Sequence, residues 1–456
     1  MSEQKLNDIL LSISEKRNII IHSCGGTGKT FTLKLLAENL RSTAGKKVYV
    51  TSSTGVSALN FNNISESTEN KYPATTLHRF AGIGLGESPV NVLINKMKIY
   101  NKRAVKNWQK CDILIIDEIS MIGGALFQKL DEIAKILRGN DLPFGGIQLI
   151  VSGDFLQLPP VKDIWIFKTK EWEDLDFCPF IFDIPFRYTG EESNDFFQML
   201  LRVRVGKQNE NDIKILKGRV CANQKIHNIL NDLDSKNDNN LLGEIIRPTM
   251  LYSLKCDVEN FNNNELDKLP GKLVTFTSID SITKNNKSDN DKKGLEEEYI
   301  RLLEQEVPRR VSFKVGAQVM LRKNLSVEEG MINGSRGVVV EIIPEEALVV
   351  KFLNGKKVRV ELSTRTIEDK YFTVTRVQIP FILAYATTIH KCQGSTLDYV
   401  IVDLGYSVFS EGQAYVALSR CRNIKGLFIS EFTPSSILVN KDALEYIKAL
   451  EEKSKK

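Results

Sequence analysis

A glycine-rich turn followed by a lysine and a threonine is the part of this sequence best suited to chemistry. The turn contains Gly25, Gly26 and Gly28, and Lys29 and Thr30 come directly after it. Glycines let the backbone turn sharply and point its N–H groups inward, where they can bind an anion. A lysine here can reach the β- and γ-phosphates of a nucleotide, and the threonine hydroxyl can hold Mg²⁺. These residues predict a phosphate-binding loop.

The segments on either side of the turn support this prediction. The apolar run at 19–21 is typical of a buried strand, and apolar residues recur at helical spacing from Leu33 to Leu40. A phosphate-binding loop requires this order of strand, loop and helix, and the helix N-terminus adds positive potential. The usual G-x-x-x-x-G-K-[ST] pattern is incomplete, because Ser23 replaces its first glycine.

An acidic pair supplies the second part of the expected site. Asp117 and Glu118 follow an apolar run at 113–116 that predicts another buried strand. The aspartate can help to hold Mg²⁺, and the glutamate can orient and deprotonate an attacking water. An acidic pair at a strand end is common and by itself does not identify a site. It indicates a nucleotide site only because the phosphate loop accompanies it. Together the two features predict hydrolysis of a nucleoside triphosphate.

Three further polar residues are candidates for contact with the γ-phosphate. Gln157, in SGDFLQLPPV, follows a predicted strand at 147–151 and either senses the phosphate or caps a turn. Arg187, in DIPFRYTG, and Arg420, in GQAYVALSRCR, could stabilise the charge that develops during phosphoryl transfer. Each arginine could instead form an ordinary surface ion pair. If both reach the site from a second domain, nucleotide binding would close the cleft between domains.

The order of elements predicts an α/β fold. Predicted strands at 19–21, 48–51, 113–116 and 147–151 alternate with helical patterns, as in a doubly wound parallel sheet. Such sheets bind ligands at the carboxyl ends of their strands, where the phosphate loop and the acidic pair are expected. Short β-type runs and Asn-Gly turns between 314 and 362 predict a small β-barrel inserted in a second α/β domain.

Composition narrows the class of protein. The 456 residues allow two to four domains, and a net charge of +5 is compatible with a nucleic-acid partner without requiring one. Seven dispersed cysteines fit a reducing compartment. None of them forms a C-x-x-C pair and the chain has only four histidines, so a zinc finger is not supported. The absence of a long apolar run predicts no membrane span. We expect a protein of the cytosol, or of the nucleus, with a charged and solvated C-terminal helix at 443–453.

Seven longer motifs share one resemblance. They are HSCGGTGKT, IIDEISM, PFGGIQLIVSGDFLQLPPV, VGAQVMLRKNL, MINGSRGVV, ATTIHKCQGSTLDYVIVDLG and GQAYVALSRCR. In this order they resemble the motifs of the Pif (petite integration frequency) helicases, which are RecD-like members of helicase superfamily one. The resemblance extends from about Gln4 to Ile429, nearly the whole chain.

The resemblance implies two RecA-like P-loop NTPase domains, each a parallel sheet flanked by helices, with an SH3-like β-barrel insertion in the second. The first domain, 1A, would span 1–178, with a small strand-separating wedge at about 61–73. The second domain, 2A, would combine 179–306 with 373–456. The insertion, 2B, would span 307–372.

The resemblance also implies an activity. Members of the family are ATP-dependent helicases that move 5′ to 3′ on single-stranded DNA and unwind duplex DNA, with ATP and Mg²⁺ as cofactors. The expected partners are single-stranded and forked duplex DNA, with no membrane, and the protein would be a monomer, or a dimer on DNA. Family membership would connect it with DNA replication, repair, recombination and telomere maintenance. Its length suggests a bacterial, phage or large-DNA-virus source.

The resemblance assigns roles to residues by their position in the motifs. Catalytic roles fall to Lys29, Asp117, Glu118, Gln157, Arg187 and Arg420. Nucleotide binding falls to Gln4, Cys24, Gly25, Gly26, Thr27, Gly28, Lys29, Thr30 and Gly394. Mg²⁺ binding falls to Thr30 and Asp117. The DNA path is assigned to Thr54, His78, Asn324, His390 and Lys391.

Two departures and several alternatives accompany this assignment. Tyr188 stands where the family has glutamine, and Gln4, expected at the adenine, lies very near the start of the chain. Phe80 and Phe155 could stack on DNA bases or could pack in the core. The alternative functions are a DNA-stimulated translocase without strong unwinding, a DNA-binding scaffold without activity, and a small-molecule P-loop kinase.

Overall fold

The computed structural model describes residues 3–42, 45–54, 57–58, 61, 73–84, 86–186, 188, 191–221, 248–284, 300–301, 303–304, 307–323, 325–326, 331, 333–368, 372–397 and 399–455. Backbone contacts divide the chain into two compact units. Unit 1 comprises Met1–Arg219, Cys392–Tyr399 and Leu404–Lys456, and unit 2 comprises Val220–Lys391 and Val400–Asp403. The domain boundaries expected from the sequence stay a prediction.

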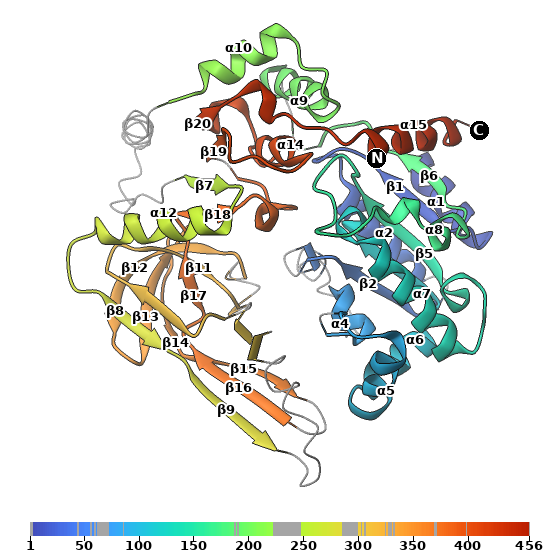
Figure 1. Ribbon diagram of the computed structural model, residues 1–456, viewed down its shortest axis with the longest axis horizontal. Helices are drawn as coiled ribbons and strands as arrows, with labels where there is room; N and C mark the ends of the chain where they lie inside the picture. Colours follow the sequence, from blue (N-terminus) through green and yellow to red (C-terminus); the bar gives the residue numbers. More distant parts are fainter. Residues whose placement is uncertain are drawn as a thin grey trace. The chain divides into compact units, whose positions relative to one another are not determined.

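Unit 1 is built on a sheet of six parallel strands. The strands are β1 (Ile19–His22), β2 (Val48–Ser52), β3 (Thr75–Thr76), β4 (Ile113–Asp117), β5 (Gln148–Gly153) and β6 (Cys178–Ile181). Their order across the sheet is β3-β2-β4-β5-β1-β6, and each neighbouring pair is parallel. Figure 1 labels β1, β2, β5 and β6 of this sheet. The predicted α/β fold with a parallel sheet is confirmed, and the carboxyl ends of β1, β2, β4 and β5 meet at one edge.

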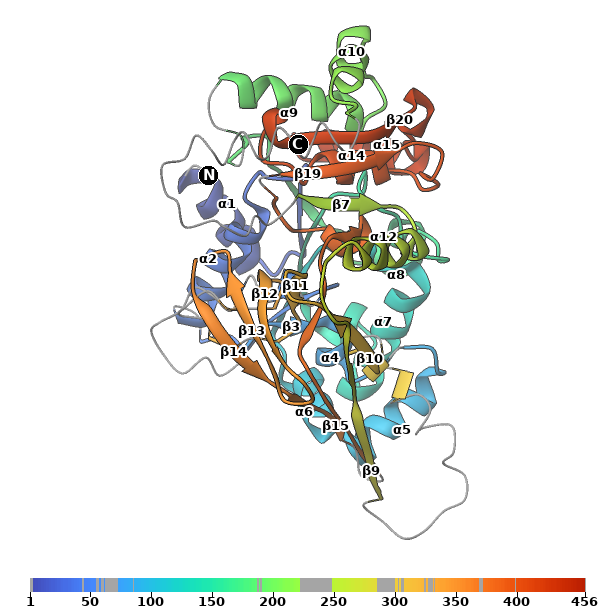
Figure 2. The same cartoon turned by 90° about the vertical axis from the view of Figure 1, so that its left-hand side faces the viewer.

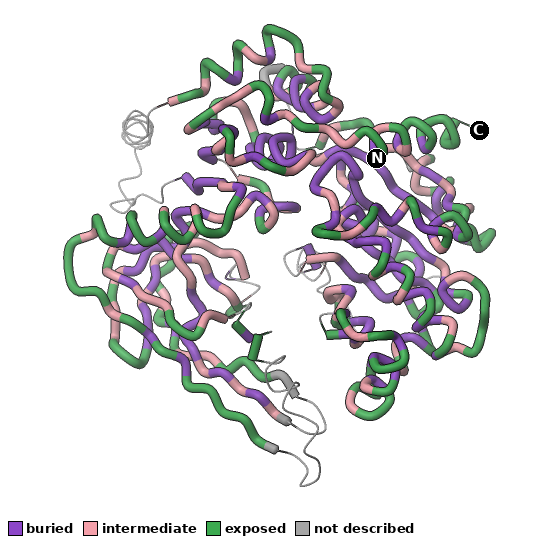
Figure 3. The backbone as a smooth tube through the Cα atoms, in the orientation of Figure 1, coloured by how far each residue is buried: buried purple, intermediate pink, exposed green. Residues whose placement is uncertain are grey.

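Helices cover both faces of this sheet because successive strand residues point to opposite sides. Ile19 and Ile21 pack against α1 (Glu3–Ser14) and α2 (Lys29–Ser42), whereas Ile20 belongs to the core on the other face. The helices that pack into that second core are α4 (Leu77–Ala81), α5 (Val90–Tyr100), α6 (Lys102–Lys110), α7 (Gly124–Arg138) and α15 (Lys441–Lys453). The central strands are buried on both faces (Figure 3).

The remaining described elements of unit 1 are 3-10 turns, four helices and one strand. They are η1 (Ile119–Met121), η2 (Pro143–Gly146), η3 (Ile166–Lys168), α8 (Lys170–Glu173), α9 (Glu191–Arg204), α10 (Glu210–Gly218), α14 (Gln413–Leu418), η6 (Ile424–Gly426), β20 (Leu427–Phe432) and η7 (Pro434–Ser436). All three tryptophans of the chain, Trp108, Trp165 and Trp172, are buried in this unit.

The C-terminal helix differs from its expected solvated state. Its side chains Ala443, Ile447 and Leu450, spaced four and three residues apart, are buried in the core of unit 1. Tyr446 accepts a hydrogen bond of 2.8 Å from the Trp172 indole N–H. The prediction of a solvated helix was wrong because the charged residues occupy only one face of α15, and the other face is apolar.

Unit 2 contains a small parallel sheet. In it, β7 (Thr249–Tyr252) pairs in parallel with both β18 (Ala386–Thr388) and β19 (Val400–Leu404). The helix α12 (Lys255–Asp267) packs on β18 and β7. A 3-10 turn, η5 (His390–Cys392), follows β18 and contains two of the predicted DNA-binding residues.

The rest of unit 2 is antiparallel. One sheet has the order β14 (Lys357–Glu361), β13 (Ala347–Phe352), β12 (Arg336–Ile343), β11 (Gln318–Leu321) and β17 (Phe381–Leu383). A separate pair, β8 (Val274–Thr277) and β10 (Arg310–Phe313), shares its apolar core. The predicted β-runs between 314 and 362 are confirmed as strands. Closure into an SH3-like barrel stays a prediction.

A three-stranded antiparallel ribbon was not expected from the sequence. It consists of β15 (Ser363–Glu368), β16 (Phe372–Gln378) and β9 (Ile279–Lys284), with β16 in the middle (Figure 1; β9 and β15 are also labelled in Figure 2). Arg376 of β16 is buried and donates hydrogen bonds of 2.8 Å to both carboxylate oxygens of Asp280 in β9.

Among the described residues of the chain, no helix is both long and apolar enough to cross a membrane.

Candidate active site

The loop between β1 and α2 forms the first part of the site. Gly26 and Gly28 have φ angles of 86° and 87°, a left-handed conformation that side-chain-bearing residues rarely adopt. A side chain at Gly28 would also lie 3.1 Å from the ring of Phe186. Because α2 begins at Lys29, the N–H groups of its first turn have no partner within the helix and favour a bound anion.

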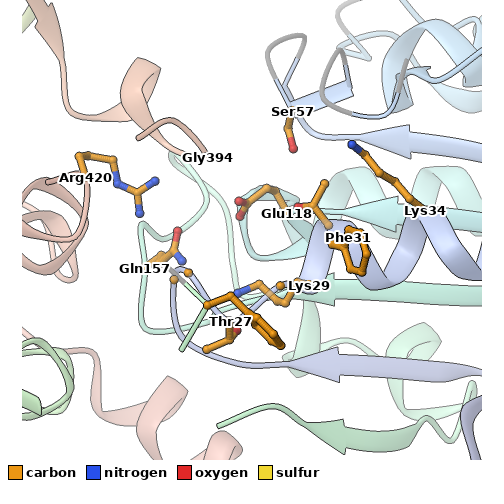
Figure 4. A pocket seen from close by; sticks show the side chains of 14 residues that line it. Thr27, Lys29, Phe31, Lys34, Ser57, Glu118, Gln157, Gly394 and Arg420 are labelled. Atoms are coloured by element: carbon orange, nitrogen blue, oxygen red, sulfur yellow. The ribbon is translucent and has the colours of Figure 1, made fainter. Parts of the chain in front are cut away.

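The loop opens into a cavity of about 530 Å³. The lining residues are Gly25, Gly26, Thr27, Gly28, Lys29, Thr30, Phe31, Lys34, Ser57, Glu118, Gln157, Phe186, Gly394 and Arg420. All of them belong to unit 1. Figure 4 shows Lys29, Glu118, Gln157 and Arg420 arranged around the same space. Residues far apart in the sequence therefore form one site.

The Asp117 carboxylate accepts four hydrogen bonds at the edge of the sheet. Its Oδ2 accepts hydrogen bonds from the Thr30 hydroxyl at 3.0 Å and from the Ser57 hydroxyl at 3.2 Å. Its Oδ1 accepts from the Ser152 hydroxyl and from the Glu118 N–H at 3.0 Å. These donors fix the orientation of the carboxylate. The threonine and the aspartate that were expected to hold Mg²⁺ are thus in direct contact.

Glu118 lies beside Asp117 in an unusual backbone conformation, with φ of 55°. Burial first, and then the negative charge of Asp117, raise the pKa of Glu118. The charge of Lys29 and a hydrogen bond of 3.2 Å from the Gln393 amide oppose this rise. Gly394 is the next residue in the chain after Gln393, and a side chain there would lie 3.8 Å from the Glu118 carboxylate. A glutamate with a raised pKa in a cavity is well suited to accept a proton from water.

Lys29 points back into the loop that precedes it. Its ammonium group donates to the carbonyl oxygens of Ser23 and Cys24, both at 2.8 Å, and to the Ser23 hydroxyl at 3.2 Å. The Ser23 hydroxyl also contacts the Thr27 hydroxyl. Ser23, which replaces the usual first glycine, is therefore part of the hydrogen bonding of the loop. Burial raises the pKa of the Cys24 thiol, which stays protonated near neutral pH.

Gln157 and Arg420 complete the lining of the cavity. The Gln157 side chain is 3% exposed, and its Oε1 has no hydrogen-bond partner among the described residues. Arg420, 2% exposed, donates to the Val416 carbonyl at 2.9 Å and to the Ser419 hydroxyl at 2.8 Å. An additional carbon at Gly25 would lie 3.5 Å from the Arg420 guanidinium.

Two tyrosines hold the arginine-bearing segment against the rest of unit 1. The Tyr415 hydroxyl of α14 accepts the Gly25 N–H at 3.0 Å, which joins this helix to the phosphate loop. Tyr188 is buried, stacks on Phe197 and donates a hydrogen bond of 3.2 Å to the Ser419 carbonyl. The residue that departs from the family pattern at position 188 thus packs against the residue before Arg420.

A buried ion pair lies behind the phosphate loop. Arg204 of α9 donates to both carboxylate oxygens of Asp154, at 2.7 and 3.0 Å, and its guanidinium lies 3.0 Å from Nε2 of His22. Burial alone would raise the pKa of Asp154, but the charge and hydrogen bonds of Arg204 outweigh it and lower this pKa to about 2. Burial, followed by the charge of Arg204, lowers the pKa of His22 to about 3.

Most of the predicted nucleotide-binding residues meet in this cavity, and a few do not. Gln4 is exposed on α1 and does not line the cavity. Cys24 is buried and contributes its carbonyl to Lys29. Arg187 lies outside the described residues, as do Asn324 and all of the expected wedge except Phe61 and Pro73.

The other predicted DNA-binding residues belong to two different units. Thr54 and His78 are half-buried in unit 1, whereas His390 and Lys391 lie in η5 of unit 2. Burial lowers the pKa of both histidines, so both are neutral near pH 7. The two aromatic candidates are core residues: Phe80 and Phe155 are 1% and 0% exposed and are not available for stacking.

Sequence reasoning missed four residues of the cavity. They are Phe31, Lys34, Ser57 and Phe186. Ser57 follows the carboxyl end of β2, and the pairing of Ser52 with Asp117 brings that end beside the acidic pair. The rule that ligands bind at the carboxyl ends of parallel strands could have found it. Phe31 and Phe186 are 57% and 52% exposed, which is unusual for phenylalanine and visible only in the structure.

A parallel sheet with a glycine-rich loop before α2, an acidic pair after β4 and a cavity between them defines a P-loop NTPase. Comparison with known families is more specific. Residues 2–214 match the model of the PIF1-like helicase family, and residues 302–342 match that of the DNA helicase Pif1 2B domain. The crystal structure of Pif1 helicase from Candida albicans has a TM-score of 0.80 at 31% identity and covers 99% of both chains. The chain belongs to the PIF1-like helicase family.

Two further comparisons agree with this assignment. ATP-dependent DNA helicase PIF1 of Danio rerio is 36% identical over 458 residues, covering 97% of this chain and 63% of the relative. A Bacteroides Pif1 structure in complex with ADP-AlF4 has a TM-score of 0.67 at 25% identity, covering 99% of this chain and 97% of that one. The chain thus spans about 63% of the length of the curated relative from Danio rerio.

Proposed function

We propose that this protein is an ATP-dependent DNA helicase that moves 5′ to 3′ on single-stranded DNA and unwinds duplex DNA. The observation that carries the proposal is the single cavity that joins the phosphate loop, Glu118, Gln157 and Arg420. The relatives named ATP-dependent DNA helicase PIF1 in Danio rerio and Emericella nidulans are 36% and 32% identical over 97% of this chain. The partners we propose are single-stranded and forked duplex DNA, bound by a monomer or, on DNA, a dimer.

The residues of the cavity fit Mg²⁺ and a nucleoside triphosphate. The Thr30 hydroxyl and the Asp117 carboxylate supply the oxygen donors that Mg²⁺ prefers. The unpartnered Oε1 of the buried Gln157 shows that this side chain has capacity for a further hydrogen bond. Mg²⁺ in this position would neutralise charge on the β- and γ-phosphates.

Each residue then has a distinct role in hydrolysis. Lys29, released from the carbonyls of Ser23 and Cys24, binds the phosphates, and the N–H groups at the start of α2 support them. Glu118 orients the attacking water and accepts its proton. Arg420 stabilises the charge that develops on the γ-phosphate, as an arginine finger does. We propose further that Gln4 contacts the adenine, and that Arg187 acts with Arg420.

DNA would be held by its backbone. We propose that Thr54, His78, Asn324, His390 and Lys391 line its path, as their positions in the family motifs imply.

Seven cysteines without disulfide bonds fit a protein of a reducing compartment, the cytosol or the nucleus.

Strand separation on matched tailed duplexes tests the proposal. One duplex carries only a 5′ single-stranded tail and the other only a 3′ tail, each with and without Mg-ATP. We expect unwinding of the 5′-tailed duplex alone. Unwinding of the 3′-tailed duplex would overturn the polarity, and DNA-stimulated ATP hydrolysis without unwinding of either duplex would show a translocase.

Two variants connect that activity to the cavity. Lys29→Ala should abolish ATP hydrolysis and unwinding while DNA binding persists. Glu118→Gln should bind ATP and fail to cleave it, because an amide cannot accept the proton from water. Normal turnover by either variant would show that the active site lies elsewhere.

A further inference from the structure

One stretch of unit 1 carries positive charge only. Between Glu87 and Asp112 the sequence has no acidic residue, although it has six lysines and arginines. The four that lie in α6 are Lys102, Arg103, Lys106 and Lys110, and all four are exposed. We call these four side chains the basic face. Within the described part of the chain, none of them forms an ion pair with a carboxylate.

The opposite side of α6 is fixed to its neighbours. Trp108 is fully buried and donates its indole N–H to the Ala81 carbonyl of α4 at 3.1 Å. Ala104 packs so closely on Gly82 that a carbon added at Gly82 would lie 2.4 Å from its Cβ. At the C-terminus of α6, the Arg138 guanidinium donates to the carbonyls of Trp108 and Cys111 at 2.8 and 3.0 Å. The basic face is therefore held rigidly on α4, the helix that contains His78.

The spacing and composition of the basic face fit a nucleic-acid backbone. From Lys102 to Lys110 the helix rises ~12 Å, at 1.5 Å per residue. The phosphates of one duplex strand follow each other about every 3.4 Å along the axis, so the basic face is long enough to reach several of them. Single-stranded DNA is usually held by cations together with aromatic rings on which its bases stack. The basic face has no exposed aromatic residue, since Trp108 is buried and Tyr100 is half-buried. This favours a duplex, in which the bases are stacked on one another and the phosphates lie along the outside.

We propose that the basic face binds the phosphate backbone of duplex DNA. The inference rests on the proposed helicase function and extends it, because it assigns a surface to the strands before they are separated. Contacts with phosphates alone carry no sequence information, which suits an enzyme that must advance on any sequence. The rigid attachment of α6 to α4 keeps the duplex contact at a constant distance from His78.

The test measures binding to a blunt-ended duplex as a function of salt, without nucleotide. In the test variant, Lys102, Arg103 and Lys106 are each changed to Gln, which preserves helix propensity. Each lost phosphate contact should reduce the salt slope of log K by about 0.9, so that the triple change should reduce it by about 2.7. Affinity for single-stranded DNA and ATPase activity stimulated by it should stay unchanged.

Two controls separate this effect from general charge and from folding. In the first, Lys441, Lys448 and Lys455, three exposed lysines in and after α15, are changed to Gln, and the duplex salt slope should not move. In the second, Lys102 and Lys106 are changed to Arg, and duplex binding should be retained because the charge is conserved.

The outcomes are distinguishable. An unchanged duplex slope in the test variant would overturn the proposal, and so would an equal loss of single-stranded DNA binding. Because the assay uses blunt duplex and no ATP, a failure of the helicase proposal would appear in the tailed-duplex assay instead.

Discussion

At the residue scale, Glu118 illustrates how neighbouring residues shift the pKa of a proposed catalytic group. Burial and the adjacent Asp117 favour its protonated form, whereas Lys29 and Gln393 favour its ionised form. A base must be ionised to accept a proton, so the rate of hydrolysis should fall as the pH drops through the raised pKa of Glu118. Gln393 therefore extends the active range of the enzyme toward lower pH.

Changing Gln393 to Ala should move this acidic limit. The variant loses the 3.2 Å hydrogen bond that stabilises the ionised carboxylate, so the pKa of Glu118 should rise further. Because this hydrogen bond favours the charged form, its loss should move the acidic limit of the rate to higher pH. The measurement is kcat for ATP as a function of pH. A limit that stays in place, or moves to lower pH, would show that Gln393 does not act on Glu118.

Ser57 offers a second prediction, because it joins two parts of the site. Its hydroxyl donates to Asp117 at 3.2 Å, and its N–H donates to the Thr54 hydroxyl at 3.2 Å. Ser57→Ala should lower kcat/KM about tenfold and raise the Mg²⁺ concentration needed for half-maximal rate, since Asp117 loses one donor. The matched control is Ser53→Ala, whose hydroxyl contacts Met121 and not the carboxylate. Equal effects of both changes would contradict the role of Ser57.

Some residues of the site can be predicted from the sequence, and others cannot. Lys29, Asp117 and Glu118 are recognisable because each follows a buried strand, and strand ends converge in a parallel sheet. Ser57 is helical and Gln393 lies in a turn after η5, and neither position is marked by an apolar run or a recognisable spacing. Their roles depend on which neighbour each side chain reaches, and no spacing rule gives that information.

At the element scale, apolar patterning explains which segments were predictable. β1, β4 and β5 are buried on both faces and read as continuous apolar runs. The ribbon of β9, β15 and β16 has mostly polar residues, such as STRTIE in β15, so its strands carry little hydrophobic signal. α15 was misjudged for the opposite reason, because its many charges hide an apolar stripe.

The ribbon depends on one buried arginine. Arg376 is 1% exposed and binds Asp280, Glu304 and the Val307 carbonyl. Arg376→Met should remove the cation that both carboxylates share and destabilise the ribbon by about 3 kcal/mol. Hydrogen exchange of the β9 and β16 amides should accelerate while unit 1 is unaffected.

An exposed ion pair in the same unit serves as the control for Arg376. Arg359 contacts Glu346 and Glu361 at the surface, and such pairs contribute less than about 1 kcal/mol. Arg359→Met should leave hydrogen exchange in the ribbon nearly unchanged. If both substitutions had the same effect, burial of Arg376 would not be the source of its contribution.

At the scale of the whole molecule, His22 connects stability to pH. Its pKa in the folded state is about 3, compared with 6.5 for an exposed histidine. Between these values the unfolded chain binds a proton that the folded chain does not, so stability is lost as the pH falls below 6.5. The loss is up to about 1.4 kcal/mol per pH unit. Asp154, with a pKa lowered from 3.8 to about 2, adds to the loss of stability only below about pH 3.8.

His22→Gln should remove this dependence, because glutamine keeps an acceptor for Arg204 and does not titrate. Tryptophan fluorescence reports selectively on unit 1, since all three tryptophans lie there. We expect the unfolding midpoint in urea to fall less steeply between pH 6.5 and 3.8 in the variant. Identical slopes in both proteins would show that His22 is not the responsible group.

The distribution of cysteines gives the molecule a built-in place for a probe. Cys256, on α12 of unit 2, is exposed, whereas Cys24, Cys111, Cys392 and Cys421 are buried. A thiol-reactive dye should label Cys256 first in the native protein. Energy transfer from the tryptophans of unit 1 to such a dye would follow the separation of the two units during a nucleotide cycle, with no residue introduced for the purpose.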